Sequence, residues 1–440
     1  MTNSLKNTFK QRTLWKNNRS SAIYPIDIIE NSNFIFLFIN YWKLKNKIKS
    51  LNCIITLFRE NGSIKEKKKY NIKKHNEISL KKFFKINNFR GMVQIEFISK
   101  ENLRFPFPAV TGLYMSPAGY PSAVHSAGRI LNKNEFVKKE NIQMEESNFS
   151  FKYSLKEQIT PFFSLYKSDI TTKKDEIKIY LKDEKKNNLE IKKLKNLLQE
   201  PYSNKIFYLD KIFNNQLLKK SKYCVVRTNF NKVFSRMICG NFFKKIHHYE
   251  VTHSYSVQKN KKDIIDDRYS NDKEVNHMSF LPFVKSKKTK LSIRIFPTNL
   301  SSNLKGNLLI YDKEKNRLMK NKKIDFNPKN NFKEIKFDKK DKIFGCISLK
   351  QKKIPSRINA SYIYNNENKN KITTDTALGF KSIEYPAKKT HWGSIYLDKK
   401  IKTELLIRKI LCNKGESISD GKIIFFNNQM RKEINIILNN

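Results

Sequence analysis

The sequence predicts an all-β protein: a tandem array of antiparallel β-sandwich domains, jelly-roll or immunoglobulin-like, with three full repeats and a C-terminal half repeat. One observation is a hairpin pattern that returns along the chain. A second is the series of short apolar runs with turn residues between them and no long helix, which is typical of sandwiches. A third is the composition, because 32 Phe and 19 Tyr supply enough large side chains to fill sheet cores.

The hairpin pattern occurs four times as a β-rich apolar run, a polar turn with Asn or Gly, and a second apolar segment. The four apolar runs occupy 54–58, 177–181, 308–311 and 423–426. Their last residues are separated by 123, 130 and 115 positions. A period near 120 is the size of a small domain and is too long for a solenoid repeat.

The domain limits follow from this period and from composition. We expect a basic N-terminal tail, three sandwich repeats and a partial fourth repeat, at 1–21, 22–131, 149–258, 277–380 and 391–440. The segments between the repeats are charged and poor in large apolar residues, as linkers are. The stretches that begin at His277 and His391 align without a gap, and each opens a repeat.

Each full repeat has four clear strand candidates. In the first repeat they are 34–42, 53–58, 78–84 and 92–97. In the second they are 162–166, 177–181, 206–209 and 224–229, and in the third 291–296, 308–311, 332–337 and 344–349. Between the second and third strands of repeat two, the spacing of five apolar residues predicts a short amphipathic helix: Leu189, Ile191, Leu194, Leu197 and Leu198.

The partial fourth repeat ends directly after its first hairpin. A lone hairpin is barely stable in water. It therefore packs on repeat three, or it pairs with another chain in self-association, or the chain has lost its end.

The formal net charge is +49, from 89 basic and 40 acidic residues. Such a field attracts polyanions, so one alternative function is binding of RNA or of an anionic polysaccharide. Only 14 of the basic residues are Arg. Evolved phosphate and base recognition favours Arg more strongly, so codon bias toward Lys is the competing explanation.

Cysteine usage and the apolar runs bear on the compartment. Five Cys without a C-x-x-C pair indicate buried thiols in a reducing environment: Cys53, Cys224, Cys239, Cys346 and Cys412. The residues before Ser21 lack the apolar core of a secretory signal, and the apolar run 34–42 is too short to be a membrane span. We expect a cytoplasmic protein without a transmembrane segment.

A second signature closes repeats one and two. Gly112 and Gly240 are each followed by twelve residues and then His-Ser. In repeat one this signature lies within 105–128, where 24 successive residues contain no Lys, Arg, Asp or Glu. Pro and Gly within it predict a shaped loop rather than a plain strand.

Tyr rings, hydroxyls, a His and an Arg suit a neutral polar ligand such as a sugar. The candidate ligand-binding residues are Tyr114, Tyr120, His125, Ser126, Arg129, Arg236 and His253. The competing interpretation is that the charge-free segment packs against a neighbouring repeat.

Catalytic motifs are absent from the sequence: there is no P-loop, no G-x-S-x-G and no H-E-x-x-H. We therefore expect no cofactor and no metal, since the His residues lack the close spacing of a metal motif. The leading hypothesis is a non-enzymatic binding or structural protein, because tandem sandwiches resemble adhesive and glycan-binding arrays. The remaining alternative is an enzyme whose site lies between repeats and contains His125, His253 and a neighbouring Arg or Asp.

Overall fold

The computed structural model of the chain describes residues 17–104, 107–125, 128–130, 145–169, 175–185, 187–229, 233–234, 237–254, 256–258, 277–285, 289–298, 304–312, 318–326, 332–338, 343–351, 357–366, 418–426 and 431–439. In these residues nearly every element is a strand, and the strands pair antiparallel. The predicted class, an all-β tandem array of antiparallel sandwiches, is confirmed. The exact number of repeats and their residue limits stay predictions.

The first sandwich consists of two four-stranded sheets. One sheet has the order β1 (Arg19–Ile28), β6 (Phe89–Ile98), β3 (Asn52–Arg59) and β4 (Ile64–Tyr70). The other has the order β5 (His75–Ser79), β2 (Asn33–Ile39), β7 (Val110–Met115) and β8 (Pro121–His125). Two short helices, α2 (Tyr41–Asn46) and α3 (Leu80–Phe84), begin where the side chains of Asn40 and Ser79 accept hydrogen bonds from the first turn.

The second sandwich repeats this arrangement. Its first sheet has the order β13 (Asn188–Lys195), β12 (Glu176–Lys182), β15 (Tyr223–Thr228), β10 (Glu145–Ser150) and β19 (Ser256–Gln258). Its second sheet has the order β14 (Asn204–Tyr208), β11 (Ile159–Tyr166), β17 (Ile238–Phe243) and β18 (His248–His253). The helical turns are η2 (Leu209–Lys211), α4 (Asn215–Lys220) and η3 (Lys244–Ile246).

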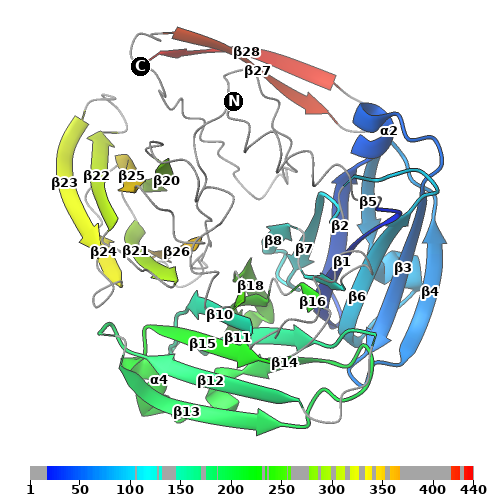
Figure 1. Cartoon of the computed structure of the whole chain (residues 1–440), viewed down its shortest axis with the longest axis horizontal. Helices are drawn as coiled ribbons and strands as arrows, with labels where there is room; N and C mark the ends of the chain where they lie inside the picture. Colours follow the sequence, from blue (N-terminus) through cyan, green and yellow to red (C-terminus); the bar gives the residue numbers. More distant parts are fainter. Residues whose placement is uncertain are drawn as a thin grey trace.

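The third sandwich also has two sheets. The first has the order β20 (His277–Lys285), β25 (Ile343–Gln351), β22 (Leu304–Asp312) and β23 (Leu318–Phe326). The second has the order β24 (Lys333–Phe337), β21 (Thr289–Thr298) and β26 (Arg357–Asn366). The last described elements, β27 (Ile418–Phe426) and β28 (Arg431–Asn439), pair with one another. Figure 1 shows the three sandwiches in chain order around the view.

The three sandwiches share one strand order. In each, the first strand pairs with the sixth, the sixth with the third and the third with the fourth, while the second strand lies between the fifth and the seventh. The recurring sequence pattern forms the hairpins β3–β4, β12–β13 and β22–β23. All three hairpins carry a register shift next to the turn, at Phe58, Lys182 and Tyr311. A shared bulge at the same place is expected of related domains.

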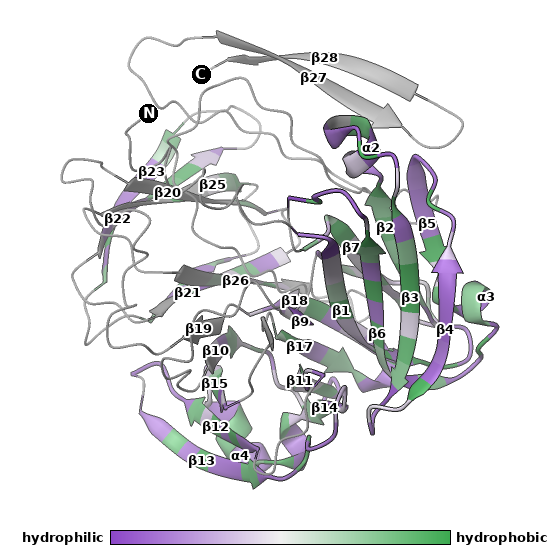
Figure 2. Ribbon diagram, turned by 45° about the vertical axis from the view of Figure 1, so that its right-hand side comes forward, coloured by the Kyte–Doolittle hydropathy of each residue, from purple (hydrophilic) through white to green (hydrophobic). Residues whose placement is uncertain are grey.

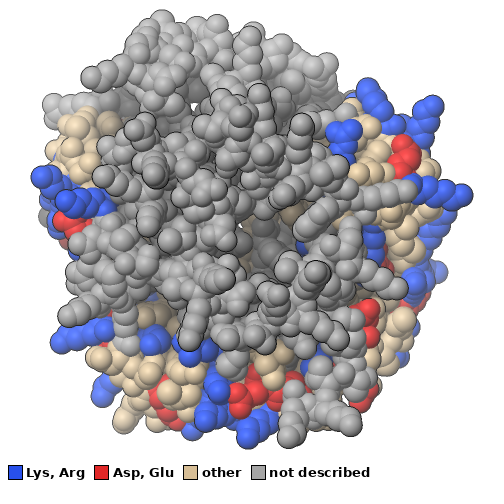
Figure 3. Space-filling view, in the orientation of Figure 1, with Lys and Arg blue, Asp and Glu red and all other residues tan. Residues whose placement is uncertain are grey.

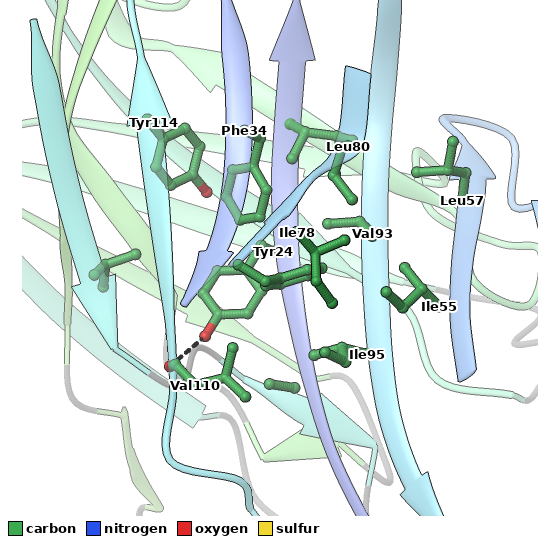
Figure 4. Close-up of a cluster of buried hydrophobic side chains, with 14 of the residues drawn as sticks. Tyr24, Phe34, Ile55, Leu57, Ile78, Leu80, Val93, Ile95, Val110 and Tyr114 are labelled. Atoms are coloured by element: carbon green, nitrogen blue, oxygen red, sulfur yellow. Dashed lines mark hydrogen bonds between the residues drawn. The ribbon is translucent and has the colours of Figure 1, made fainter. Parts of the chain in front are cut away.

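The largest apolar core lies between the sheets of the first sandwich (Figure 4). The rings of Tyr24, Phe34 and Phe36 contact one another with centroids 5.1 to 5.5 Å apart. The Tyr24 hydroxyl donates to the Val110 carbonyl at 2.9 Å, which satisfies the buried polar group. A Cβ on Gly112 would lie 2.6 Å from the Phe34 ring, so this position requires glycine to admit the aromatic cluster.

In each recurring hairpin the outer strand is more exposed to solvent than its partner strand. Figure 2 shows β4 and β13 mostly purple and β3 mostly green. Strand β4 reads Ile-Lys-Glu-Lys-Lys-Lys-Tyr and has no fully buried residue. A lysine-rich edge strand discourages pairing with another sheet, which gives part of the high net charge a structural role.

Several sequence-based expectations are corrected. The segment predicted to form an amphipathic helix is the strand β13, whose alternating exposure matches the two-residue period of an edge strand. The strand expected at 78–84 divides into the end of β5 and the helix α3. Strand β1 begins at Arg19 and strand β10 at Glu145, close to the expected starts of the first two repeats.

Cys53, Cys224 and Cys239 are buried thiols that form no disulfide, as expected. Burial raises the pKa of Cys53 and of Cys224, so both thiols stay protonated. None of the helices in the described part of the chain is long and apolar enough to cross a membrane.

Candidate functional site

The charge-free segment of repeat one forms a β-hairpin, not the loop that its Pro and Gly content predicted. Strands β7 and β8 pair from Thr111 opposite His125 to Met115 opposite Pro121. In the turn between them, the Ser116 hydroxyl accepts from the Tyr120 N–H at 3.0 Å. Gly119 takes a φ of +81° there. Pro and Gly therefore define a tight turn, and the residues around it are ordinary strand residues.

The Gly240–Ser254 segment of repeat two forms the corresponding hairpin, β17–β18. Gly240 adopts a φ of +154°, and a Cβ there would lie 1.9 Å from the Glu250 carbonyl oxygen. Glycine is therefore required at the two positions of the signature for different steric reasons. Gly112 admits aromatic rings, and Gly240 allows a close approach of two backbones.

These two hairpins meet at the contact between the first and second sandwiches, called the first interface below. The Val251 N–H donates to the Ser122 hydroxyl at 2.9 Å. The Nε2 atoms of His125 and His253 lie 3.4 Å apart, and their rings are close to perpendicular. The sequence signature therefore brings the two predicted histidines together, from edge strands of two different sandwiches.

The other predicted ligand-binding residues lie at different positions and do not form one site with the two histidines. Tyr114 is buried, and its hydroxyl donates to the Pro25 carbonyl at 2.7 Å. Arg129 is buried in the short strand β9 (Arg129–Ile130), which pairs with β16 (Val233–Phe234). Tyr120 is half-buried at the turn, next to the ring of His248. Ser126 and Arg236 lie outside the described residues.

The exposed surface of this predicted set is therefore small. Tyr114, Arg129 and His253 are 8%, 5% and 3% exposed, which leaves Tyr120 and His125 as the described members that solvent reaches. The geometry favours the competing interpretation, that the charge-free segment packs between repeats.

A polar network that the sequence did not reveal crosses the same interface. The Tyr249 hydroxyl donates to the Asp27 carboxylate at 2.5 Å and is bonded to the Tyr208 hydroxyl. The Nε2 atom of His247 lies 3.7 Å from the same Asp27 oxygen. Burial raises the pKa of Tyr249, and the neighbouring Tyr208 and Asp27 add to this effect. The network thus holds a protonated phenol between two sandwiches.

A shallow pocket lies beside this network, lined by Asp27, Ser32, Asn33, Ser116, His247 and Tyr249 with apolar neighbours. Its enclosed volume is about 10 Å³, which is room for one water molecule. A sugar ring does not fit into such a space. The polar network is therefore best understood as a means of fixing the two sandwiches to one another.

A larger cavity lies at the contact between the second and third sandwiches, called the second interface below. Its volume is about 300 Å³, at the lower limit for small-molecule sites. The lining residues come from both sandwiches: Lys152, Lys290, Leu291, Ser292, Arg294, Glu334, Lys336, Phe337, Asp338 and Ile363.

Arg294 and Glu334 organise this cavity. The guanidinium of Arg294 donates to the carbonyl oxygens of Phe151 and Lys222 in the second sandwich, at 2.8 and 3.3 Å. It also donates to Glu334 at 3.0 Å. Burial alone would raise the pKa of Glu334, but the hydrogen bond from Ser292 and the charge of Arg294 lower it to about 2. The carboxylate is therefore ionised at every physiological pH.

Sequence reasoning missed Asp27, Arg294 and Glu334. A signal existed for Asp27, because it is the one acidic residue in β1 and lies in the apolar stretch 22–28 of that strand. In β21 the buried Leu291, Ile293 and Ile295 alternate with Ser292 and Arg294. That alternation predicts two faces, but not which neighbour contacts the outer one.

Comparisons with known proteins add little. No family model matches the chain, and no curated protein matches it. Among solved structures, a calcium-binding mutant of beta-glucuronidase 2 from Bacteroides uniformis is 11% identical, with 57% of this chain and 28% of that chain covered and a TM-score of 0.13. A tetra-tandem repeat from the extending region of a large adhesion protein is 8% identical, with 83% and 75% covered and a TM-score of 0.11. Likenesses this weak carry no argument about function.

Proposed function

We propose that this tandem β-sandwich protein is a non-enzymatic binding protein that holds an acidic carbohydrate in the cavity at the second interface. The observation that carries the proposal is the cavity of about 300 Å³ with basic side chains from two sandwiches in its lining. The proposal moves the ligand from the charge-free hairpin of the first interface, where the predicted residues are largely buried.

The charges of the cavity favour an anion. Four basic residues line it, against the two acidic residues Glu334 and Asp338. Glu334 is already held by Arg294 and Ser292. Lys290 and Lys336 are exposed, so their ammonium groups are accessible to a carboxylate, sulfate or phosphate on a ligand.

The remaining lining suits a sugar. The apolar lining residues Phe337, Leu291 and Ile363 are 8% exposed or less and lie behind the polar lining, and Ser292 and Asp338 offer hydrogen-bonding groups in front of them. Carbohydrate sites typically combine an apolar surface with a few oriented polar groups. The two kinds of group together favour a saccharide that carries an acidic group over a neutral sugar.

The alternative of diffuse polyanion binding predicts a single basic stripe. In the face shown in Figure 3, basic side chains of the described residues lie along the right, lower and left edges, with acidic side chains among them. This spread supports a local site over a general electrostatic surface.

The experiment is a glycan array with neutral, uronate-containing and sulfated saccharides, followed by titration of the best ligand. The test variant is Lys290→Gln/Lys336→Gln. The matched control is Lys320→Gln/Lys322→Gln, which removes two exposed charges from β23 of the same sandwich, outside the cavity lining. We expect acidic glycans to bind, and the test variant to weaken binding by about tenfold, while the control changes it less than twofold.

Each other outcome contradicts the proposal. Equal loss in both double variants would show that net charge alone attracts the ligand. Binding of neutral glycans that depends on Tyr120 and His125 would return the site to the first interface. Absence of binding to every saccharide would reject the carbohydrate ligand.

A further inference from the structure

His125 and His253 are the two residues of different sandwiches whose ring nitrogens meet at the first interface. Their Nε2 atoms lie 3.4 Å apart, and the ring centroids are separated by 4.8 Å. Two imidazoles bound to one tetrahedral zinc ion, each at 2.0–2.1 Å, have their nitrogens about 3.3 Å apart. The spacing between the two sandwiches is therefore already the spacing that a shared metal ion requires.

The environment of His253 also fixes its tautomer. Its Nδ1 lies 3.2 Å from the Ser254 carbonyl oxygen, which can only accept a hydrogen bond. The proton of the neutral ring therefore sits on Nδ1, and the lone pair of Nε2 points toward His125. A backbone carbonyl that orients a ligating histidine in this way is a common feature of metal sites.

The two side chains differ in exposure. His253 is 3% exposed, whereas His125 is exposed on the edge strand β8. The pair therefore has a rigid, buried side and a side open to solvent, from which an ion can enter. Among the described residues no third His, Cys, Asp or Glu joins the pair, so water would complete the coordination.

We propose that His125 and His253 together bind a divalent transition-metal ion across the first interface, with zinc, nickel and copper as the fitting class. Neutral imidazoles select these ions over magnesium and calcium, which prefer oxygen ligands. Strands β8 and β18 hold both histidines, and the bond from Val251 to Ser122 ties those strands together, so binding requires little rearrangement. The bound ion would link the first two sandwiches and stabilise their contact.

The test uses the full chain after treatment with a chelator, with Zn²⁺ in calorimetry and Co²⁺ in absorption spectroscopy. We expect binding at pH 7.5 that weakens at least tenfold in His125→Ala and in His253→Gln. His75→Ala, which removes a histidine of β5 in the first sandwich, should leave binding unchanged. At pH 5.5 the wild-type affinity should fall, because both imidazoles must be neutral to bind.

Since His253 is buried, His253→Gln can disturb folding, and the exposed His125→Ala variant is then decisive. Unchanged Zn²⁺ affinity in a folded His125→Ala variant overturns the proposal. Loss of binding in His75→Ala to the same extent overturns it as well. Absence of Zn²⁺ binding to the wild type would show that the pair is only a hydrogen bond.

Discussion

The first and second interfaces join neighbouring sandwiches in different ways. At the first, the core of the first sandwich continues through Phe162, Ile238, Tyr249 and Val251 of the second, in one cluster of buried residues. At the second, the core of the third sandwich remains separate. The contact there rests on Arg294 with its carbonyl partners and on a small patch that includes the stacked rings of Tyr223 and Phe332.

The difference teaches that related domains can be combined into one cooperative unit or left as neighbours. A shared apolar core makes the first two sandwiches depend on one another, because either alone would expose that surface to water. The third sandwich keeps its own core, and the cavity lies at its boundary. We therefore expect the first two sandwiches to unfold in a single transition and the third in another.

A substitution in the turn of the first recurring hairpin, which contacts the second sandwich, has the largest expected effect on stability. A Cβ at Gly62 would lie 2.0 Å from the Pro201 carbonyl oxygen in the second sandwich, and φ is +90°. Backbone atoms cannot yield as side chains can, so Gly62→Ala should lower the free energy of unfolding of the first two sandwiches by about 4 kcal/mol. Urea denaturation followed by tryptophan fluorescence measures this loss.

Gly119→Ala is the matched control. Gly119 has a similar φ of +81°, but a Cβ there would meet nothing within 4 Å. It should therefore cost about 1 kcal/mol from backbone strain alone. Equal effects of the two variants would show that the turn at Gly62 does not fasten the interface.

Arg294→Met tests the second interface and has the second-largest expected effect on stability. It leaves Glu334 without its guanidinium and removes the donor to two carbonyl oxygens of the second sandwich. We expect a loss of about 3 kcal/mol in the transition of the third sandwich, measured by calorimetry.

Lys336→Met removes another cation near the same carboxylate, 3.6 Å away, but Lys336 is 73% exposed. Lys336→Met should lower the free energy of unfolding of the third sandwich by less than about 1 kcal/mol. If Arg294→Met instead lowers both transitions equally, the two interfaces are not independent and the comparison fails.

The sequence predicted the fold well because sandwich strands are encoded locally. Alternation and turn residues located the hairpins, and their spacing indicated the repetition. The helix expected at 189–198 was wrong because Leu189, Ile191 and Leu194 also fit a strand that is only partly buried, and pairing with β12 decided between the two. That pairing depends on tertiary context, which no local pattern contains.

The candidate sites were less predictable, since both lie where two domains meet. The Gly-x12-His-Ser signature marked His125 and His253, but nothing in their spacing showed that the rings meet. Arg294 lies in an ordinary alternating strand, and its function comes from carbonyls of another domain. Sequence periodicity indicates that a face is exposed or buried within its own domain, not which partner covers it.

Lower pH has an expected effect that is smaller than those of Gly62→Ala and Arg294→Met, and it distinguishes the two interfaces. Burial lowers the pKa of His248 to about 4, partly opposed by a hydrogen bond to the Tyr120 backbone. Between about pH 6.5 and pH 4, His248 is neutral in the folded protein but protonated in the unfolded chain. The unfolded state therefore binds more protons, and the free energy of unfolding decreases as the pH is lowered. At pH 5 the resulting loss in the free energy of unfolding of the first two sandwiches is about 2 kcal/mol.

Glu334 behaves differently, because its folded pKa of about 2 lies below its ordinary value. The stability that it contributes is complete above about pH 4.5 and is lost only as pH falls toward 2. Calorimetry from pH 7 to 5 should therefore lower the transition of the first two sandwiches while that of the third stays nearly constant. His248→Gln should flatten the pH dependence of the former. A third-sandwich transition that falls equally over this range would show that the ion pair at Glu334 is not what holds the second interface.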